Sequence, residues 1–397
     1  ETYLGLHRFA WLPGAIEPVA RAWVWHLWEI WLNHFGDGGK GWPWHPYTAA
    51  ERAINVLSYA RSHGLPAAAQ KSLDGLAKHA KWIADNLEYF GDHYTSNHLS
   101  NNGRGLFTLG LELDLPKAAA LGRAILLNEA ERIFLPSGML REGSSHYHLL
   151  LTKNYLAAWL LAVRHNDVAA AALGEVTNRA LMAAKIFQFS CAVPLIGDIS
   201  PDCPPKFVSC LANNQIDGWL GTLSDAEQGL IAALPAQQET SSERPVQKDG
   251  WLRWGCEGWD SLWYISPDGG PPMPGHGHQD SGSFQLHFND KPVFVDLGRG
   301  SYRMDETSVF ACSAGAHNSL SIDGMDPFPI NRPYYSPSFR AAVSGSPPDV
   351  SAGRDQLEIS HKGFARLKGI EKYTRRCRIS GTELTLTDTV EGTGIHR

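Results

Sequence analysis

The chain has 397 residues, of which 43% are hydrophobic and 19% charged, so it is long enough for two globular domains and too apolar to be disordered. Its formal net charge is −6 at pH 7, and it contains no dense run of lysine and arginine, which argues against a nucleic-acid-binding protein. Because no stretch of about eighteen apolar residues occurs, we expect no membrane span.

The hydrophobic pattern of residues 23–234 has the period of α-helices. Over residues 71–90 the apolar positions recur at alternating steps of three and four, which predicts one buried helical stripe. Similar stripes occupy Leu121–Phe134, Leu149–Val163 and Val168–Phe187, with short breaks between them. Helices joined by short loops form antiparallel hairpins, and hairpins in series give a solenoid or, if the series closes, a ring.

The pattern changes after Pro235–Gly250, a polar, proline-bearing segment that is the best linker candidate. Short alternating stretches separated by Gly, Pro and Asp follow, as in an antiparallel sandwich or barrel. The expected strands are WLRWG, SLWYIS, SFQLHF, PVFVDL, SLSIDG, FRAAVSG, LEISHKG, YTRRCRIS and ELTLTDTV. We predict a helical domain over 1–235, a linker over 236–249, and a β domain over 250–397 that continues past this sequence.

The stretch HYTSNHLSNNGRG is the first of three polar clusters. It lies between two helical stripes and is dense in polar side chains, among them Asn97, His98, Asn101 and Asn102. One interpretation is a helix-capping loop, for which Ser and Asn are well suited. The other interpretation is a functional site.

The stretch LREGSSHYHLLLTKNYL is the second cluster. A serine at 144–145 can cap a helix, which places Tyr147 and His148 in its first turn. With Arg141 and Glu142 beside them, these residues predict a polar, solvent-facing opening rather than part of an apolar core. The alternative is an ordinary capping turn with a half-buried tyrosine.

The stretch PGHGHQDSGSFQLHFNDKPVFVDLGRGSY is the third cluster and reads as two strands with NDK as their turn. His276 and His278 are two residues apart, so on a strand they would face the same way, a common arrangement for metal binding or acid–base chemistry. The alternative is a surface loop with chance histidines. His278, Asp296 and His317 offer two imidazoles and a carboxylate, a set suited to Zn²⁺. A cupin-type site would need a Glu shortly after the second histidine, where Gly and Ser stand.

Five stretches together carry a resemblance to a known family: EGSSHYH, the series GHGHQD…VDLG…HN, HNSLSIDG, SNHLSNNG and WPWHPYTAAERAINVL. They resemble motifs of the heparinase II/III superfamily of polysaccharide lyases, from about Gly41 to the last residue. The resemblance implies a multidomain α + β fold, an incomplete (α/α) toroid followed by an antiparallel β-sandwich. It also implies β-elimination of a uronic-acid-containing acidic polysaccharide or oligosaccharide, and we expect a bacterial protein that is periplasmic or secreted rather than cytoplasmic. The oligomeric state stays open.

The resemblance assigns roles residue by residue. Tyr147 and His276 match the catalytic tyrosine and histidine, and Asn97 with His98 matches the position that neutralises the uronate carboxylate. A structural zinc set is implied at His278, Asp296 and His317, with no organic cofactor. Expected substrate contacts are Trp44, Asn101, Arg141, Glu142 and Arg299. Many relatives carry Glu where this chain has Asn101, which leaves the sugar specificity open.

The implied chemistry follows from acidity. A proton α to a carboxylate becomes removable only when hydrogen bonds or positive charge stabilise the enolate-like dianion, here from Asn97 or His98. A base then takes the C5 proton and an acid protonates the O4 leaving group. Tyr147 can be the acid, and also the base where both groups lie on one face of the sugar, while His276 would serve the opposite-face epimer.

Two other classes of function stay in view. One is a non-catalytic glycan-binding or polysaccharide-assembly protein on the same fold. The other is a toroid hydrolase, for which the sequence offers no clear pair of acidic residues.

Overall fold

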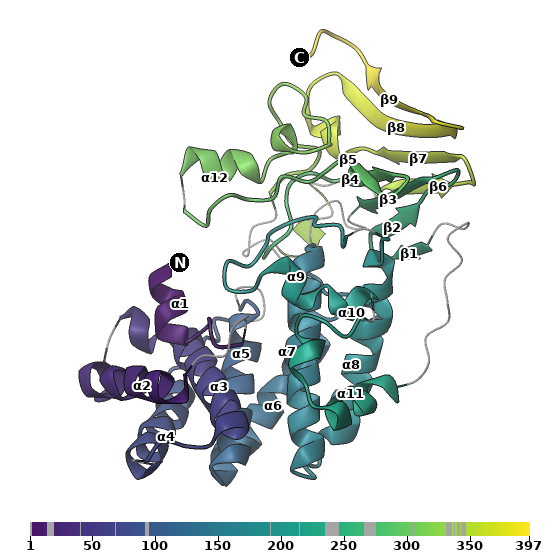
Figure 1. Ribbon diagram of the computed structural model, residues 1–397. Coiled ribbons are helices and arrows are strands. Elements are labelled where there is room, and N and C mark those ends of the chain that lie inside the picture. Colours follow the sequence, from purple (N-terminus) through teal and green to yellow (C-terminus); the bar gives the residue numbers. More distant parts are fainter. Residues whose placement is uncertain are drawn as a thin grey trace.

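A computed structural model describes most of the chain. The described residues are 2–13, 20–39, 41–67, 69–91, 95–190, 192–213, 215–234, 246–265, 275–303, 305–330, 336, 338–339, 342 and 347–397. Helices occupy the first part of the chain and antiparallel sheets the last part, stacked end to end (Figure 1). This arrangement confirms the predicted fold class, an incomplete (α/α) toroid followed by a β-sandwich.

The helical part is built from long helices that lie side by side (Figure 1). The long helices are α2 (Arg21–Phe35), α3 (Pro46–His63), α4 (Ala69–Asp85), α5 (His98–Glu112), α6 (Pro116–Ile133), α7 (Ser145–Arg164) and α8 (Ala170–Ala184). The short ones are α1 (Thr2–Arg8), η1 (Trp42–Trp44), η2 (Lys185–Phe187), α9 (Pro205–Val208), α10 (Cys210–Asn213), η3 (Leu220–Thr222) and α11 (Asp225–Ala232). Among the helices described, none has both the length and the apolar character needed to cross a membrane.

Local sequence explains where these helices begin and end. Ser144 caps α7, since its Oγ accepts a hydrogen bond of 3.0 Å from the backbone N–H of Tyr147, which confirms the predicted cap. Helix α4 buries the predicted stripe but ends at Asp85, short of the expected residue 90, and Phe90 is exposed. Helices α5 and α6 approach closely at Gly110, where an added Cβ would lie 2.2 Å from the backbone nitrogen of Ala119.

Two antiparallel sheets form the sandwich. The first has the order β1 (Val246–Lys248), β2 (Trp251–Trp254), β3 (Trp259–Tyr264), β4 (Ser283–Phe288) and β5 (Lys291–Phe294). The second has the order β6 (Asp349–Ala352), β7 (Gln356–His361), β8 (Ile370–Ser380) and β9 (Glu383–Gly392). The short helices α12 (Glu306–Ala311), η4 (Ala314–Ala316) and η5 (Gly363–Arg366) lie in their connections.

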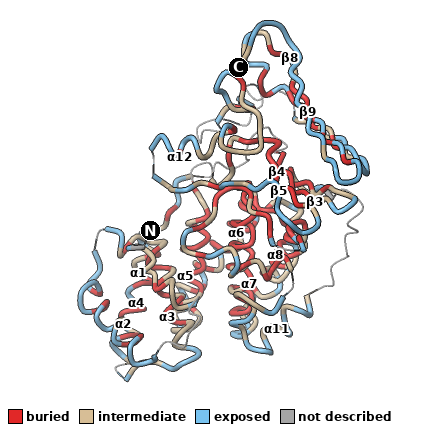
Figure 2. Tube along the Cα trace, turned by 45° about the horizontal axis from the view of Figure 1, so that its top comes forward, coloured by how far each residue is buried: buried red, intermediate tan, exposed pale blue. Residues whose placement is uncertain are grey.

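The sheets face each other across one apolar core. Leu252, Trp263 and Phe284 of the first sheet pack in one cluster with Leu357 and Cys377 of the second. Buried positions are concentrated in the inner helices and the facing strands, whereas β9 is mostly exposed (Figure 2). The last part of β8 alternates between buried and exposed residues as the sequence pattern indicated, whereas β4 is buried at five consecutive positions and therefore on both faces.

Several strand predictions need correction. The stretch SLSIDG forms only an isolated bridge between Ile322 and Met325, and the segment of His276 and His278 is a loop, bridged only at the neighbouring Gln279. Strand β5 stops at Phe294, so the last residues of PVFVDL are also loop. Most of FRAAVSG and residues 236–245 of the predicted linker lie outside the described residues, and the domain boundaries stay a prediction.

Candidate active site

Asp198 connects the helical part to the loop that carries the two histidines. Its backbone N–H donates to the carbonyl of His276 (2.8 Å), and its own carbonyl accepts from Ser144 Oγ at the start of α7 (2.8 Å). One carboxylate oxygen lies 3.2 Å from His276 Nδ1 and the other 2.9 Å from His278 Nε2. The two imidazoles are therefore held by one carboxylate rather than by the strand pleat that the sequence suggested.

The charge of Asp198 follows from these contacts. Burial would raise its pKa, but hydrogen bonds from His276 and His278 outweigh burial and hold the pKa well below the usual range. Arg299 adds a positive charge, with Nη1 3.5 Å from Asp198 Oδ2. An ionised carboxylate at this position fixes the orientation of both histidine rings.

Tyr147 and His276 meet at the junction of the two halves. Their rings stack with centroids 3.4 Å apart and planes 11° apart. The hydroxyl of Tyr147 is 3.0 Å from that of Tyr302, whose ring lies 4.7 Å from the Arg299 guanidinium carbon. Burial, followed by the proximity of Tyr302, raises the pKa of Tyr147, so the phenol carries its proton at neutral pH. A protonated phenol is the form that a general acid requires.

Glu142 lies behind His276 and not on the surface. Its Oε2 is 3.6 Å from His276 Nε2, and both carboxylate oxygens are buried without a hydrogen-bond partner among the described residues. Burial raises the pKa of Glu142, while His276, His98 and Arg132 act in the opposite direction. The prediction that Glu142 contacts substrate is wrong, because the side chain is fully covered. Its neighbour Arg141 is partly buried.

His98 approaches the same region from the start of α5. Its Nδ1 is 2.7 Å from Glu88 Oε1, its ring centroid is 4.6 Å from that of Tyr47, and its side chain is 43% exposed. Burial raises the pKa of Tyr47, and Glu51 and Tyr147 raise it further, whereas Arg8 lowers it. Tyr147 and His276 thus meet although they come from distant parts of the chain, and the charges of His276 and His98 both act on the buried carboxyl of Glu142.

Asn97 is the residue before α5, but its side chain makes no capping hydrogen bond, so the capping interpretation is wrong for this residue. Its side chain is buried, and it precedes His98 in the chain. Asn101 also differs from the prediction: its amide donates to the carbonyl of Tyr47 (3.2 Å) and its oxygen accepts from Arg104 (2.9 Å). Both polar ends of Asn101 are used within the protein, so it positions Tyr47 rather than contacting substrate.

Trp44 is not available for sugar stacking. It is buried in the helical core, where its ring packs against those of Trp31 and His79. Its indole N–H donates to the carbonyl of Phe35 (2.6 Å). The prediction of a substrate contact at Trp44 is therefore wrong, and the exposed tryptophan of the same turn is Trp42.

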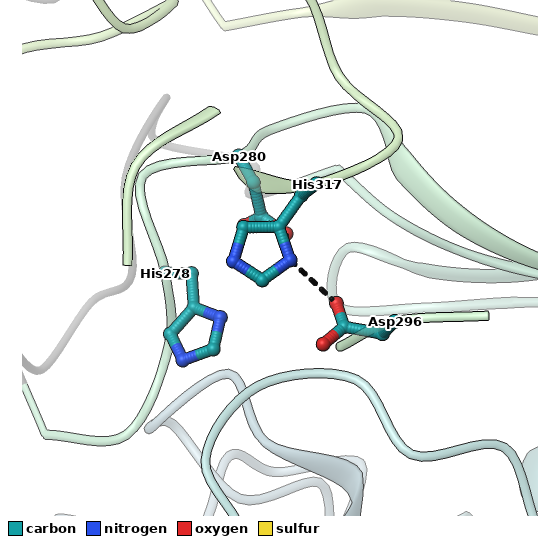
Figure 3. A group of neighbouring side chains, drawn as sticks. All are labelled: His278, Asp280, Asp296 and His317. Carbon is teal, nitrogen blue, oxygen red and sulfur yellow. Dashed lines mark ion pairs between the residues drawn. The ribbon is translucent and has the colours of Figure 1, made fainter. Parts of the chain in front are cut away.

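Four side chains close to Asp198 form a candidate metal group. His278, Asp280, Asp296 and His317 each offer one ligand atom, and these atoms lie within 4.8 Å of one another. Figure 3 shows the four side chains around a common point, with His317 Nδ1 3.1 Å from Asp296 Oδ2. The group contains the three predicted ligands and adds Asp280.

The protonation pattern of this group fits a divalent cation. His278 donates through Nε2 to Asp198, and His317 donates through Nε2 to the carbonyl of Ala311 (2.7 Å). Burial would lower the pKa of both rings, but hydrogen bonds outweigh it: Asp198 raises the pKa of His278 to about 10, and Asp296 raises that of His317. A bound cation would take the place of the Nδ1 proton on each ring. His278 Nδ1 and Asp280 Oδ2 are buried without a hydrogen-bond partner among the residues described. Two nitrogens and two oxygens are a ligand set typical of zinc.

Comparison with known proteins identifies the β region. Residues 244–397 match the family model described as heparinase II/III-like, C-terminal. This part of the chain is therefore similar to the C-terminal domain of heparinase II/III-like proteins. The match confirms the resemblance to the heparinase II/III superfamily that the sequence motifs indicated. Comparison with curated proteins finds no sequence match.

Solved structures extend the heparinase-like fold to the whole chain. The crystal structure of heparinase III matches with a TM-score of 0.69 and 16% identity, covering 98% of this chain and 63% of the other. Heparan sulfate lyase HepC from Pedobacter heparinus matches with a TM-score of 0.58 and 15% identity, covering 99% of this chain and 61% of the other. The chain thus spans less than two thirds of these proteins, and at this identity the likeness concerns the fold.

Sequence reasoning missed several residues of this candidate site. Asp198 follows Gly197 in a segment without periodicity, and Glu88 follows the end of α4, so neither carried a pattern. Asp280 and Tyr302 stood inside the quoted histidine stretch, and their residue types were the available signal. What only the structure supplies is the pairing of Asp198 with residues about eighty positions later.

Proposed function

We propose that the protein is a polysaccharide lyase that cleaves a uronic-acid-containing acidic polysaccharide by β-elimination. The observation that carries this proposal is the stacked pair of Tyr147 from the helical part and His276 from the β part. A proton donor and an imidazole meet where the two parts of the chain meet, a common position for substrate sites. His98 acts electrostatically on the same buried Glu142 carboxyl as His276. The fold shared with heparinase III and heparan sulfate lyase supports the same class of reaction.

The side chains proposed to neutralise the uronate carboxylate are those of Asn97 and His98. Glu88 accepts the hydrogen bond from His98 Nδ1, so Nε2 of this 43% exposed side chain would be the atom that meets a substrate carboxylate. Asn97 offers an amide with no capping role. A hydrogen bond or a positive charge on the carboxylate lowers the free energy of the enolate-like dianion that forms when C5 loses its proton.

Proton transfer falls to Tyr147 and His276. The Tyr147 phenol is protonated, so it can donate to the O4 leaving group, and Tyr302 holds its hydroxyl in place. For the epimer whose C5 proton lies on the opposite face, His276 Nε2 would accept that proton. Glu142, 3.6 Å away, would then stabilise the imidazolium.

We infer that the group of His278, Asp280, Asp296 and His317 holds zinc in a structural role. Bound zinc would supply cross-linking of the loops and no proton transfer. The consequence for the site comes from His278, because it shares the Asp198 carboxylate with His276. Fixing His278 fixes Asp198, and Asp198 orients His276.

The test is a panel of acidic polysaccharides followed by the ultraviolet absorbance of the 4,5-unsaturated uronate product. On any polymer that is cleaved, Tyr147→Phe should lower kcat by about 10²-fold or more, since a proton carrier is lost while the ring packing stays. Tyr155→Phe is the matched control, because this buried tyrosine lies on the same helix α7 and its hydroxyl donates to the carbonyl of Leu126 (3.0 Å). Near parental activity in Tyr147→Phe would show that the site is assigned wrongly. Binding without product would favour a non-catalytic glycan-binding protein.

A second pair of variants separates the two carboxylate-binding candidates. Asn97→Ala and His98→Ala are compared on the same polymer. The residue that neutralises the uronate should cost about as much kcat as Tyr147, since it acts in the transition state. If both variants keep parental kcat, the neutralising group lies elsewhere.

A further inference from the structure

An exposed aromatic pair lies beside His98. Trp42 in η1 is 59% exposed, and its ring stacks on that of His45 with centroids 5.4 Å apart and planes 25° apart. Single exposed apolar side chains are common on protein surfaces, so exposure alone indicates no site. The case for a site rests on how this pair is held and on what it adjoins.

The turn that carries the pair is rigid. Pro43 follows Trp42 and Pro46 follows His45, and a proline restricts both its own backbone and that of the residue before it. Between them, Trp44 is buried and anchored by its hydrogen bond to Phe35. An exposed ring on a rigid turn loses little conformational freedom when it binds a ligand, which favours binding.

Glu88 connects the pair to the candidate active site. One of its oxygens, Oε1, lies 3.6 Å from His45 Nε2 and 2.7 Å from His98 Nδ1. Its other oxygen accepts a hydrogen bond of 2.9 Å from the amide of Asn102. A single buried carboxylate therefore sets the spacing of the two imidazoles, whose centroids are 6.1 Å apart. The platform of Trp42 and His45 is thus fixed one side chain away from His98.

The chemistry of the platform fits a sugar ring. A pyranose presents an apolar face of C–H groups and a polar edge, and the face of an indole carries partial negative charge that attracts such hydrogens. We propose that Trp42 and His45 form a subsite for the pyranose residue next to the one held by Asn97 or His98, with its ring stacked on the indole. This inference rests on the proposed function and adds a determinant of chain-length preference.

The kinetic test compares Trp42→Ala and Trp42→Phe with Trp23→Ala. Trp23 on α2 is a matched control, because it is 50% exposed and its ring lies 5.3 Å from that of Trp11. On a cleaved polymer, Trp42→Ala should raise KM by roughly tenfold with kcat within about twofold, Trp42→Phe should restore part of the loss, and Trp23→Ala should match the parent. On the shortest oligosaccharide cleaved, the difference should vanish. An unchanged KM in Trp42→Ala, or an equal change in Trp23→Ala, would overturn the subsite.

A binding test separates failure of the subsite from failure of the proposed function. If the parent gives no unsaturated product from any polymer, the lyase proposal fails, and the same polymers are then cast into native gels. Retardation of the parent and Trp23→Ala, but weaker retardation of Trp42→Ala, would support the subsite without catalysis. Equal migration of all three proteins would overturn it.

Discussion

Two buried polar clusters, one in each half of the protein, differ in where their polar atoms find partners. In the helical half, Arg52 donates to the carbonyls of His7 (2.9 Å) and Pro43 (2.8 Å) and to His79 Nε2 (2.9 Å), and its guanidinium lies 3.8 Å from the ring centre of Trp31. In the β half, four ligand atoms face one another, and apart from the contact of His317 Nδ1 with Asp296 Oδ2 (3.1 Å) they have no hydrogen-bond partner among the described residues.

This difference distinguishes a polar cluster that stabilises the fold, around Arg52, from one that is suited to bind a ligand, the group of four metal-ligand side chains. Buried donors and acceptors are normally paired, because an unpaired one costs about 1–3 kcal/mol. Arg52 Nε and Nη1 donate to atoms of the protein, while its Nη2 has no hydrogen-bond partner among the described residues. We interpret this cluster as part of the helical core because its acceptors are all satisfied by Arg52. The acceptors of the β cluster converge on one point, which favours a cation there. Four predictions test this contrast.

The largest expected effect is removal of the metal. With zinc about 1,000-fold above its dissociation constant, binding contributes about 4 kcal/mol, so a chelator should lower the Tm of the β part by about 10 °C. His317→Ala should lose the bound metal, measured by elemental analysis, and the response to chelator with it. His361→Ala is a control, since this buried histidine lies outside the ligand group. Metal-free protein with an unchanged Tm would contradict the assignment.

A pH effect should follow from a histidine that the protein satisfies internally. His148 Nδ1 accepts from the N–H of Leu140 (3.2 Å), its Nε2 donates to the carbonyl of Ala180 (3.0 Å), and burial lowers its pKa to about 4. The folded pKa lies below the unfolded value near 6.5, so this stability is fully present above about pH 6.5 and is lost as the pH falls towards 4, in total about 3 kcal/mol. Urea unfolding across this range should show a shallower slope for His148→Gln. Equal slopes would mean that His148 charges without cost.

A smaller effect is expected at Arg52. Arg52→Met should lower the free energy of unfolding by about 2 kcal/mol, because the acceptors of His7, Pro43 and His79 lose their donor while a buried charge is removed. Urea unfolding measures the change, and the chelator response should stay parental. Arg21→Met, which removes an exposed hydrogen bond to the carbonyl of Leu65, serves as the control and should have little effect. An increase in the free energy of unfolding of Arg52→Met would contradict a stabilising role of Arg52 in the helical core.

The smallest effect concerns the support of the metal group. Arg375 Nη1 donates to the carbonyls of Gly282 (3.0 Å) and Asn318 (2.6 Å), two residues after Asp280 and one after His317. Arg375→Lys cannot make both bonds and keep its paired contact with the carboxylate of Asp388, so metal affinity should fall about tenfold in competition with a chelating dye. Arg376→Lys, exposed on the same strand, should match the parent. Equal affinities would exclude this support.

Much of the fold was predictable because it rests on local patterns. The stripe and the Ser144 cap placed Tyr147 in the first turn of α7, and alternation located β4 and most strands of the second sheet. The ligand types of His278, Asp296 and His317 marked three members of the metal group. Burial within short turns was not predictable from the sequence. In the turn WPW, Trp44 is buried and Trp42 is exposed, and a segment of three residues is too short for a hydrophobic period to distinguish them.

By itself, the sequence determined the order of helices and strands, the helix cap before Tyr147 and the residue types able to act as acid or ligand. Period and capping act over a few residues, so they are legible along the chain. Tertiary structure alone decided that Asp198 holds both histidines, that Glu88 holds His45 and His98, and that Asp280 completes the metal group. Most of these residues lie in loops, where no hydrophobic period predicts the direction in which a side chain points. They come into contact only because the packed helices and sheets bring these segments together.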